Sequence, residues 1–315
     1  MIRAFPLVNK DFFSRVAILG PGLLGGSLAM ALRRYLPDLE VHLWGRRIEP
    51  LQIAEQFQLA DLYTTDLARA VDGCDLIVFA TPVGVMLPLA TKMLPFLSAD
   101  VLVTDVGSVK AFVHNQLGAF CAEHSLAFIG SHPMAGSEKQ GIEYADADLF
   151  DKATVVLTGG EDRSISLMEK LAHFWNAVGG LCLEMSPEQH DRTVATISHM
   201  PHAMAAICSL SAGDCGDTAV SRMLSAGGFR DTTRIAMGEP CMWAEILLEN
   251  KDEVLFALEH CAQRLEELKK MLQEGAGYGA GADGKIKTRA ALQGWLSDAR
   301  QTRATIVSME KEERF

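Results

Sequence analysis

The stretch RVAILGPGLLGGSLAMALRRYL, residues 15–36, decides the fold class. Residues 15–19 are a short run of β-branched and apolar residues, which is typical of a buried strand. Glycines follow the run, and residues 25–36 then show the apolar spacing of a helix. The stretch therefore predicts a strand, a tight turn and a helix in direct succession.

The glycines of this turn have G-x-G-x-x-G spacing, a pattern that in this context indicates a dinucleotide site. Gly20 would permit the tight turn, Gly22 would leave room for a pyrophosphate, and Gly25 would let the helix pack closely on the strand. Leu23 and Leu24 would lie at the helix N-terminus, where free N–H groups attract phosphates. The alternative is a glycine-rich turn that binds no ligand.

The same alternation of strand and helix continues to about residue 185. Because nearly continuous apolar strands separated by helices are typical of sheets covered on both faces, we predict an α/β, Rossmann-type parallel-sheet domain over residues 15–185. Its further strands would be EVHLW (40–44), DLIVFAT (75–81), VLVTDV (101–106), LAFIG (126–130), ATVVLT (153–158) and GLCLEM (180–185).

From residue 186 the chain reads as helical. Ser186 is an expected N-cap with Pro187 at the first helical position and Gln189 completing a capping box. We predict an all-helical substrate-binding and dimerisation domain over 186–273, a flexible glycine-rich linker over 274–284 and a C-terminal helix over 285–315.

One long helix is expected over 239–273, with an apolar stripe suited to a helical partner. Its residues are Leu247, Val254, Leu258, Cys261, Leu265, Leu268 and Leu272. We therefore expect a homodimer, and the alternative is packing of this stripe within one chain.

Composition narrows the function classes. The 315 residues carry 40 acidic against 29 basic side chains and a formal net charge of −11, so no global field would attract nucleic acid or an acidic membrane. Seven cysteines without C-x-x-C pairs suit a reducing compartment, and the N-terminus lacks the apolar core of a signal peptide. We expect a cytoplasmic protein that neither enters a membrane nor binds nucleic acid.

Cofactor choice depends on the end of the second strand, where NAD enzymes usually carry a carboxylate. Here Gly45 is followed by Arg46 and Arg47, and guanidinium groups can grip a 2′-phosphate. The sequence therefore favours NADP; the alternative is that both arginines are solvated and NAD binds. Thr81 and Pro82, in the loop FATPVG, would contact the cofactor's second half.

Five segments occur in one order: LGPGLLGGSLAMAL, DVGSVK, GSHPMAGSEKQGIEYA, SPEQHDRTVATISHMPHAMA and FRDTTRIA. Together they resemble the prephenate and arogenate dehydrogenases of tyrosine biosynthesis over residues 15 to about 272. The resemblance implies oxidative decarboxylation of a cyclohexadienol, with prephenate favoured and arogenate as the alternative substrate.

The resemblance also implies residue roles near the reacting carbon. His132 matches the catalytic histidine that draws off the hydroxyl proton, and its alternative is a buried structural histidine. Ser108 matches a serine that bonds near the same hydroxyl and orients that histidine. Because SVK is expected to open a helix, Ser108 could also be its N-cap.

In the helical part, Ser198 and His202 match pocket residues, and Arg234 matches the arginine that binds a substrate carboxylate. Trp243 matches an aromatic residue near the pocket, although simple packing is an alternative. Ser198 and His202 are four apart and would share a helix face with Asp191 and Ala195.

Pro201 lies inside the same helix and is expected to kink it. His199 and His202 form an H-x-x-H pair without a suitably spaced third ligand, so no metal is expected.

Two other function classes fit the sequence less well. A β-hydroxyacid-type dehydrogenase would rely on a lysine on the first interdomain helix, where this chain offers histidine and serine. A non-catalytic NADP sensor would not need His132, Ser108 and Arg234 together.

Overall fold

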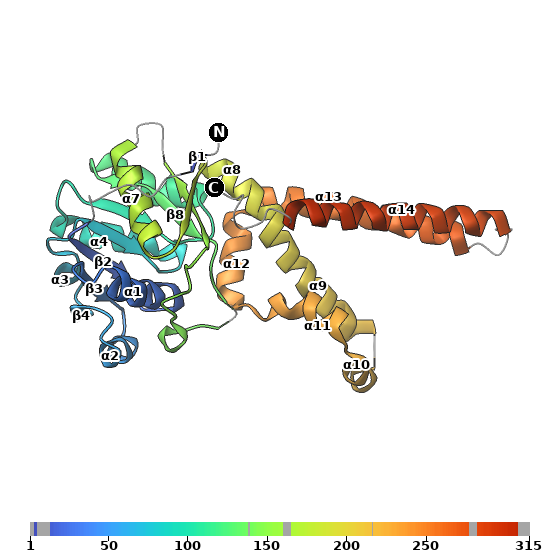
Figure 1. Cartoon of the computed structure of the whole chain (residues 1–315), viewed down its shortest axis with the longest axis horizontal. Helices are drawn as coiled ribbons and strands as arrows, with labels where there is room; N and C mark the ends of the chain where they lie inside the picture. Colours follow the sequence, from blue (N-terminus) through green and yellow to red (C-terminus); the bar gives the residue numbers. More distant parts are fainter. Residues whose placement is uncertain are drawn as a thin grey trace. The chain divides into compact units, whose positions relative to one another are not determined.

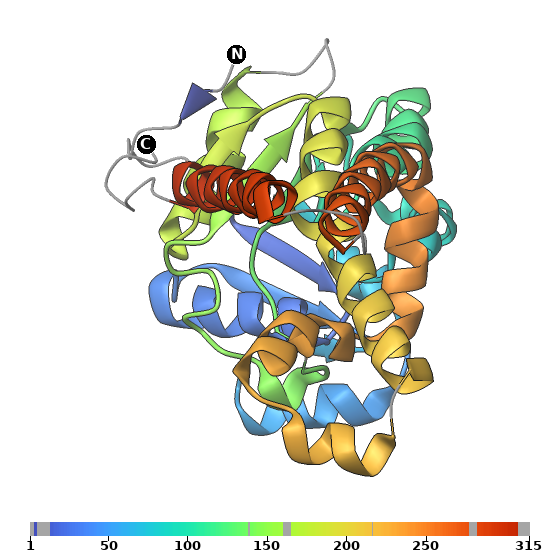
Figure 2. The same ribbon diagram turned by 90° about the vertical axis from the view of Figure 1, so that its right-hand side faces the viewer.

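The computed structural model describes residues 3–4, 13–137, 139–159, 165–215, 217–276 and 282–307 (Figures 1 and 2). Residues 277–281 of the expected 274–284 linker and residues 308–315 of the expected C-terminal helix lie outside these residues. The described ends of the expected linker, residues 274–276 and 282–284, are helical rather than extended. The chain divides into two compact units, Met1–Lys251 and Asp252–Phe315, which are described separately.

A six-stranded parallel sheet forms the centre of the first unit, in the order β4-β3-β2-β5-β6-β7. Along the chain this is the 3-2-1-4-5-6 order of dinucleotide-binding folds, so the predicted fold class is confirmed. The strands are β2 (Arg15–Leu19), β3 (Glu40–Trp44), β4 (Leu62–Thr64), β5 (Leu76–Phe79), β6 (Leu102–Asp105) and β7 (Ala127–Phe128).

Both faces of this sheet are buried, because successive side chains of a strand point to opposite faces. Val16 and Ile18 of β2 belong to one core cluster, while Ala17 and Leu19 belong to another. The first cluster includes residues of α1 (Leu23–Tyr35), α2 (Ile48–Gln56) and α7 (Ile165–Ala177). The second includes residues of α3 (Leu67–Val71), α4 (Met86–Met93), α5 (Ala111–Val113) and α6 (Ala119–Glu123), with a π-helical segment, His114–Gly118, between α5 and α6.

The last strands do not join the parallel sheet, so the expectation of one parallel sheet through residue 185 was wrong. A separate sheet has the order β1-β10-β9-β8, from β1 (Arg3–Ala4), β8 (Gly130–Pro133), β9 (Thr154–Thr158) and β10 (Leu181–Glu184). Strands β8 and β9 are antiparallel, whereas β9 and β10 are parallel. The reason lies in the connections: α7 joins β9 to β10, but only a short 3₁₀ turn, Ile142–Tyr144, interrupts the loop from β8 to β9.

The helical part of the first unit begins where the sequence predicted. Ser186 Oγ accepts the Gln189 N–H at 3.1 Å and caps α8 (Pro187–Val194). A π-helical segment, Ala195–His199, then leads into α9 (Met200–Cys215). α10 (Thr218–Leu224), α11 (Gly227–Thr233), the 3₁₀ turn Arg234–Met237 and α12 (Pro240–Glu249) follow.

The π-helical segment ends just before Pro201, which has no N–H to donate to Ile197. A wider i→i+5 turn therefore replaces regular α-helical bonding at this point. In this wider turn, His199, four residues after Ala195, lies on the same buried face as Ala195. His199 is buried, while Ser198 is half-buried. The predicted row of residues on one helix face thus includes Asp191, Ala195 and His202, but its fourth member is His199 rather than Ser198.

The prediction of a single helix over 239–273 was also wrong. The chain leaves helical geometry at Asn250 (φ −112°, ψ 28°), which separates α12 from the next helix. The Asn250 side chain is buried and donates to the Asp191 carbonyl at 2.9 Å, and it lies 3.1 Å from His199 Nδ1.

The second unit consists of α13 (Lys251–Ala276), which begins one residue before the boundary, and α14 (Ala282–Val307), drawn in orange and red in Figure 1. Leu265 and Leu272 of the expected stripe are exposed. Among the described residues, no helix has the length and apolar character needed to span a bilayer.

Candidate active site

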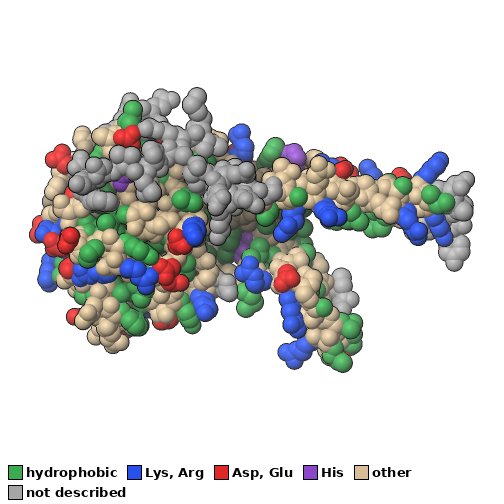
Figure 3. Space-filling model, in the orientation of Figure 1, with side chains coloured by type: hydrophobic (Ala, Val, Ile, Leu, Met, Phe, Trp, Pro, Cys, Tyr) green, Lys and Arg blue, Asp and Glu red, His purple; other side chains and the backbone are tan. Residues whose placement is uncertain are grey.

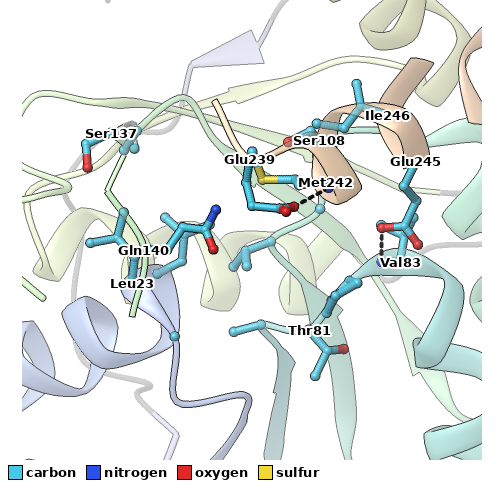
Figure 4. Close-up of a pocket in the computed structure, with 18 of the residues that line it drawn as sticks. Leu23, Thr81, Val83, Ser108, Ser137, Gln140, Glu239, Met242, Glu245 and Ile246 are labelled. Carbon is cyan, nitrogen blue, oxygen red and sulfur yellow. Dashed lines mark hydrogen bonds between the residues drawn. The ribbon is translucent and has the colours of Figure 1, made fainter. Parts of the chain in front are cut away.

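A cavity of about 410 Å³ opens in the first unit at the carboxyl ends of β2, β5 and β6 (Figure 4). Neighbouring strands β2 and β5 are the point where the strand order reverses, which is where open α/β sheets bind ligands. Five segments supply the lining: Gly22–Leu24, residues 80–83, residues 106–109, the loop residues 135–137 and 139–141, and Glu239, Met242, Glu245 and Ile246 of the α12 region.

Each of the three glycines in the turn meets different surroundings, so a side chain would have a different effect at each position. Gly20 has φ +121°, and a Cβ there would lie 2.5 Å from the Ala80 carbonyl oxygen. A Cβ on Gly25 would collide with the Gly20 carbonyl oxygen, whereas a Cβ on Gly22 would meet no described heavy atom within 4 Å. Two glycines are therefore required by packing, and Gly22 is required only if something occupies the open space beside it.

The residues of this cavity fit a dinucleotide. α1 starts at the cavity without a side-chain cap from any described residue and without an acidic side chain in its first turn, so its free N–H groups can bind phosphate. Thr81 Oγ1 is buried and has no hydrogen-bond partner among the described residues. Both features leave donors that a polar ligand would satisfy.

The residues predicted to choose the cofactor lie at the end of β3. Gly45 is buried, and Arg46 and Arg47 are exposed. A Cβ on Gly45 would lie 2.8 Å from Pro21 Cγ in the glycine turn. Arg46 and Arg47 therefore directly follow the strand end at which dinucleotide-binding folds contact the adenosine ribose.

Glu245 was missed by sequence reasoning. Its carboxylate accepts the Gly84 N–H at 2.7 Å and the Val83 N–H at 3.2 Å, as Figure 4 shows for Val83. This clamp holds the loop after β5, which carries Thr81 and Pro82, against α12. No sequence motif signalled it, because the partners are about 160 residues apart.

His132 lies on β8 and is nearly buried, with an exposed fraction of 8%. Its Nδ1 is 2.7 Å from Nε2 of His190, and Nδ1 of His190 is 2.7 Å from Oδ1 of Asp191. We name this series the His132–His190–Asp191 chain. Burial lowers the pKa of His132 well below its ordinary value, and repulsion from His190, Lys110 and His199 acts in the same direction. The ring is therefore neutral near pH 7 and able to accept a proton.

Lys110, whose backbone N–H donates to Asp191, is fully buried. Its Nζ forms an ion pair with Asp105 and donates to the Ser131 carbonyl at 2.8 Å. Burial lowers the pKa of Lys110, against the opposing attraction of Asp105. The pair ties the end of β6 to the residue next to His132.

His202 stacks on Trp243, with ring centroids 3.5 Å apart and planes 12° from parallel. His202 Nδ1 is buried without a partner among the described residues, and burial lowers the pKa of the ring. A Cβ on Gly238 would lie 3.0 Å from His202 Cε1, so the chain passes close over the stacked pair. Trp243 therefore has a packing role, which was the alternative interpretation. Its packing partner, His202, is itself a predicted pocket residue.

The predicted site residues divide into two groups in the structure. The cavity lining includes Gly22, Leu23, Leu24, Thr81, Pro82 and Ser108. It does not include the other predicted catalytic and substrate residues, namely His132, Ser198, His202, Arg234 and Trp243. Arg234 is exposed at the start of the 3₁₀ turn after α11.

The alternative interpretation of Ser108, as the N-cap of the following helix, was wrong. The helix after it begins at Ala111 with Lys110 as its N-cap residue, so Ser108 does not cap it. Among the described residues no hydrogen bond joins Ser108 to His132; the histidine ring is held by His190 instead.

Two family models match the chain. One is the prephenate dehydrogenase nucleotide-binding domain, over residues 28–184, and the other is the prephenate dehydrogenase dimerization domain, over residues 186–278. The chain belongs to the prephenate dehydrogenase family. Members of this family are NAD(P)-dependent oxidoreductases.

Individual relatives agree with this assignment. A cyclohexadienyl dehydrogenase of Zymomonas mobilis is 36% identical over 259 residues, which cover 82% of this chain and 88% of that protein. The prephenate dehydrogenase of Aquifex aeolicus, solved with hydroxyphenyl propionate and NAD⁺, superposes with a TM-score of 0.83 at 30% identity, covering 95% of this chain and all of that one. An arogenate dehydrogenase of Synechocystis gives a TM-score of 0.72 at 29% identity, covering 91% and 99%.

His190, Asp191 and Lys110 were not assigned roles in this family member from its sequence. A signal was present for the first two, because His190 and Asp191 follow Pro187 by three and four residues and precede Val194 by four and three. All four side chains are buried on one face of α8. Two adjacent polar residues on a buried helix face require partners, and that requirement could have identified them. Among the described residues no three His, Cys, Asp or Glu side chains are grouped to hold a metal ion.

Proposed function

We propose that this chain is a prephenate dehydrogenase, which converts prephenate to 4-hydroxyphenylpyruvate and carbon dioxide with hydride transfer to NADP⁺. The proposal rests on the hydrogen bonding and position of the His132 ring. The ring is held through Nδ1, and no described residue bonds Nε2. The neighbouring Ser131 bonds Thr104 and Asp105 at the end of β6, where the cavity begins.

His132 serves as the proton acceptor in this proposal. The bound nicotinamide supplies the hydride acceptor. As C4 of the substrate loses its hydride, Nε2 of His132 accepts the C4 hydroxyl proton. When the C1 carboxylate leaves as carbon dioxide, the imidazolium returns this proton to the C4 oxygen. The ring becomes aromatic, and the histidine ends in its starting state.

Other residues hold and orient the substrate. Ser108, whose hydroxyl makes no hydrogen bond to a described residue, donates to the C4 oxygen from the cavity wall. Arg234 binds a substrate carboxylate through its forked donors, and His202 and Ser198 contact the substrate beside Trp243. We propose that residues 15–185 bind the cofactor and supply Ser108 and His132, and that residues 186–273 bind the substrate's other groups.

Replacing His132 with Asn tests the catalytic assignment. We expect kcat to fall by about 10²–10⁴, the usual contribution of general base catalysis, with the dissociation constant for NADP unchanged. The assay is NADPH formation with prephenate and arogenate in parallel. Unchanged turnover in the variant would rule out His132 as the base.

Arogenate is the second candidate substrate, because a solved neighbour is an arogenate dehydrogenase. The two substrates differ at the side chain, remote from C4, so the mechanism at His132 is the same for both. A higher kcat/KM with arogenate in the parallel assay would assign the chain to that reaction.

We propose NADP rather than NAD on the basis of Arg46 and Arg47. Replacing both with Ala should weaken NADP binding about tenfold or more and leave NAD binding within about twofold, since only NADP carries the 2′-phosphate. Isothermal titration with both nucleotides measures this. A wild-type preference for NAD would contradict the proposal. The Aquifex aeolicus relative was solved with NAD⁺, so the question has to be answered for this chain directly.

A further inference from the structure

We propose that His190 and Asp191 are positioning residues that fix the tautomer of His132, so that Nε2 is the unprotonated ring nitrogen available to the substrate. This inference rests on the proposed function, because it concerns the state of the proposed base.

The Asp191 carboxylate is anchored on both oxygens. Oδ1 accepts the Lys110 N–H and Oδ2 accepts the Ala111 N–H, each at 2.8 Å. Burial alone would raise the pKa of Asp191, but its hydrogen bonds from His190 and from the Lys110 backbone lower the pKa overall. The Asp191 backbone carbonyl is also held, by the Asn250 side chain. The carboxylate is therefore ionised and has a fixed orientation.

An ionised carboxylate only accepts hydrogen bonds, so Nδ1 of His190 must carry the proton that lies between the two side chains. Burial lowers the pKa of His190, and the positive charge of Lys110 opposes a second proton, although Asp191 and Asp105 act in the other direction. His190 is fully buried and neutral, with a lone pair on Nε2.

That lone pair faces Nδ1 of His132 at 2.7 Å, so Nδ1 of His132 is the donor. A neutral imidazole carries one proton, and Nε2 of His132 is therefore bare. If His190 had the opposite tautomer, its Nδ1 lone pair would face the Asp191 carboxylate at 2.7 Å, a repulsive contact in a buried site. The fixed Asp191 carboxylate thus determines which ring nitrogen of His190 is protonated and, through His190, which ring nitrogen of His132 is protonated.

Variants of His190 and Asp191 separate this role from mere packing. His190→Gln keeps an acceptor toward His132, His190→Leu removes it, and Asp191→Asn can present an N–H to His190 and reverse both tautomers. Ser186→Ala is the matched control, because it removes the N-cap of the same helix without touching the chain. The readouts are ring ¹⁵N shifts of His132 in histidine-labelled protein, kcat and KM for prephenate, and NADP affinity.

We expect wild type, Ser186→Ala and His190→Gln to show an Nδ1–H tautomer of His132, with kcat within about tenfold of wild type. His190→Leu should show mixed tautomers and a kcat lower by about 10² or more. Asp191→Asn should show mainly Nε2–H with a larger loss, since the wrong tautomer in a serine protease triad costs about 10⁴ in kcat. KM for prephenate and NADP affinity should change by less than about threefold in all variants.

The inference is overturned if His132 keeps the Nδ1–H tautomer in His190→Leu, or if that variant loses no more activity than His190→Gln. Should Asp191→Asn fail to fold, the His190 pair decides the question alone. A wild-type protein that oxidises neither prephenate nor arogenate would remove the proposed function. The ¹⁵N shifts would still support or overturn the tautomer assignment in that case.

Discussion

Gly22 and Gly25 differ in what a side chain would meet, although both belong to one motif. A Cβ on Gly25 collides with the Gly20 carbonyl, while Gly22 faces open space. We expect Gly25→Ala to lower the free energy of unfolding by about 1–3 kcal/mol through overpacking. Gly22→Ala should keep wild-type stability yet weaken NADP binding about tenfold or more, because its methyl group occupies the ligand's space. Thermal melts and isothermal titration measure the two effects. Equal NADP affinity in Gly22→Ala would place the pyrophosphate elsewhere.

His199 makes stability depend on pH. Burial lowers the pKa of His199 from 6.5 to about 4. Between these values the unfolded chain binds more protons than the folded one, so the free energy of unfolding falls as pH drops from 6.5 toward 4. The full contribution is about 3 kcal/mol. Urea unfolding at pH 7 and pH 5 should show a smaller loss for His199→Gln than for wild type, whereas His260→Gln, at an exposed site, should match wild type. The same loss in all three proteins would contradict this assignment.

At the scale of elements, Asn250 ends α12 and joins it to α8 and the π-helical segment. Asn250→Ala leaves the buried Asp191 carbonyl and His199 Nδ1 without their donor. We expect it to lower the free energy of unfolding by about 1–3 kcal/mol in urea titrations. Gln263→Ala, at an exposed position of α13, is the control and should stay within about 0.5 kcal/mol of wild type. An Asn250→Ala value that close to wild type would mean that water replaces the side chain.

Elements governed by local pattern were predictable, and those governed by long-range partners were not. The glycine turn and β2, β3, β5 and β6 follow from apolar runs read over a few residues. Strand β8 contains Ser131, His132 and Pro133 and has no strand pattern; its conformation comes from pairing with β9. The break at Asn250 likewise depends on Asp191, 59 residues earlier. In the site, His132 was predicted from the family resemblance. The roles of His190 and Asp191 could be recognised only from the folded structure, in which His190 bonds His132 and Asp191 bonds His190.

At the scale of the whole molecule, we propose a homodimer, because residues 186–278 match a model described as a dimerization domain. Leu265 and Leu272 on α13 are exposed in the single chain, at 53% and 52%. Replacing both with Glu should convert the dimer to a monomer in sedimentation equilibrium, since buried carboxylates at an interface would be unpaired. Leu296→Glu on α14, outside the matched residues, should leave the dimer intact. A wild-type monomer at micromolar concentration would contradict the proposal.

The close approach of Gly45 to Pro21 constrains how cofactor preference could evolve or be engineered. An aspartate that would grip an unphosphorylated ribose cannot be placed at position 45 alone, because its Cβ would lie 2.8 Å from a rigid proline ring. An aspartate at position 45 would first require a smaller residue at position 21. A single substitution at position 45 would therefore introduce the carboxylate typical of NAD enzymes only by distorting the neighbouring glycine turn.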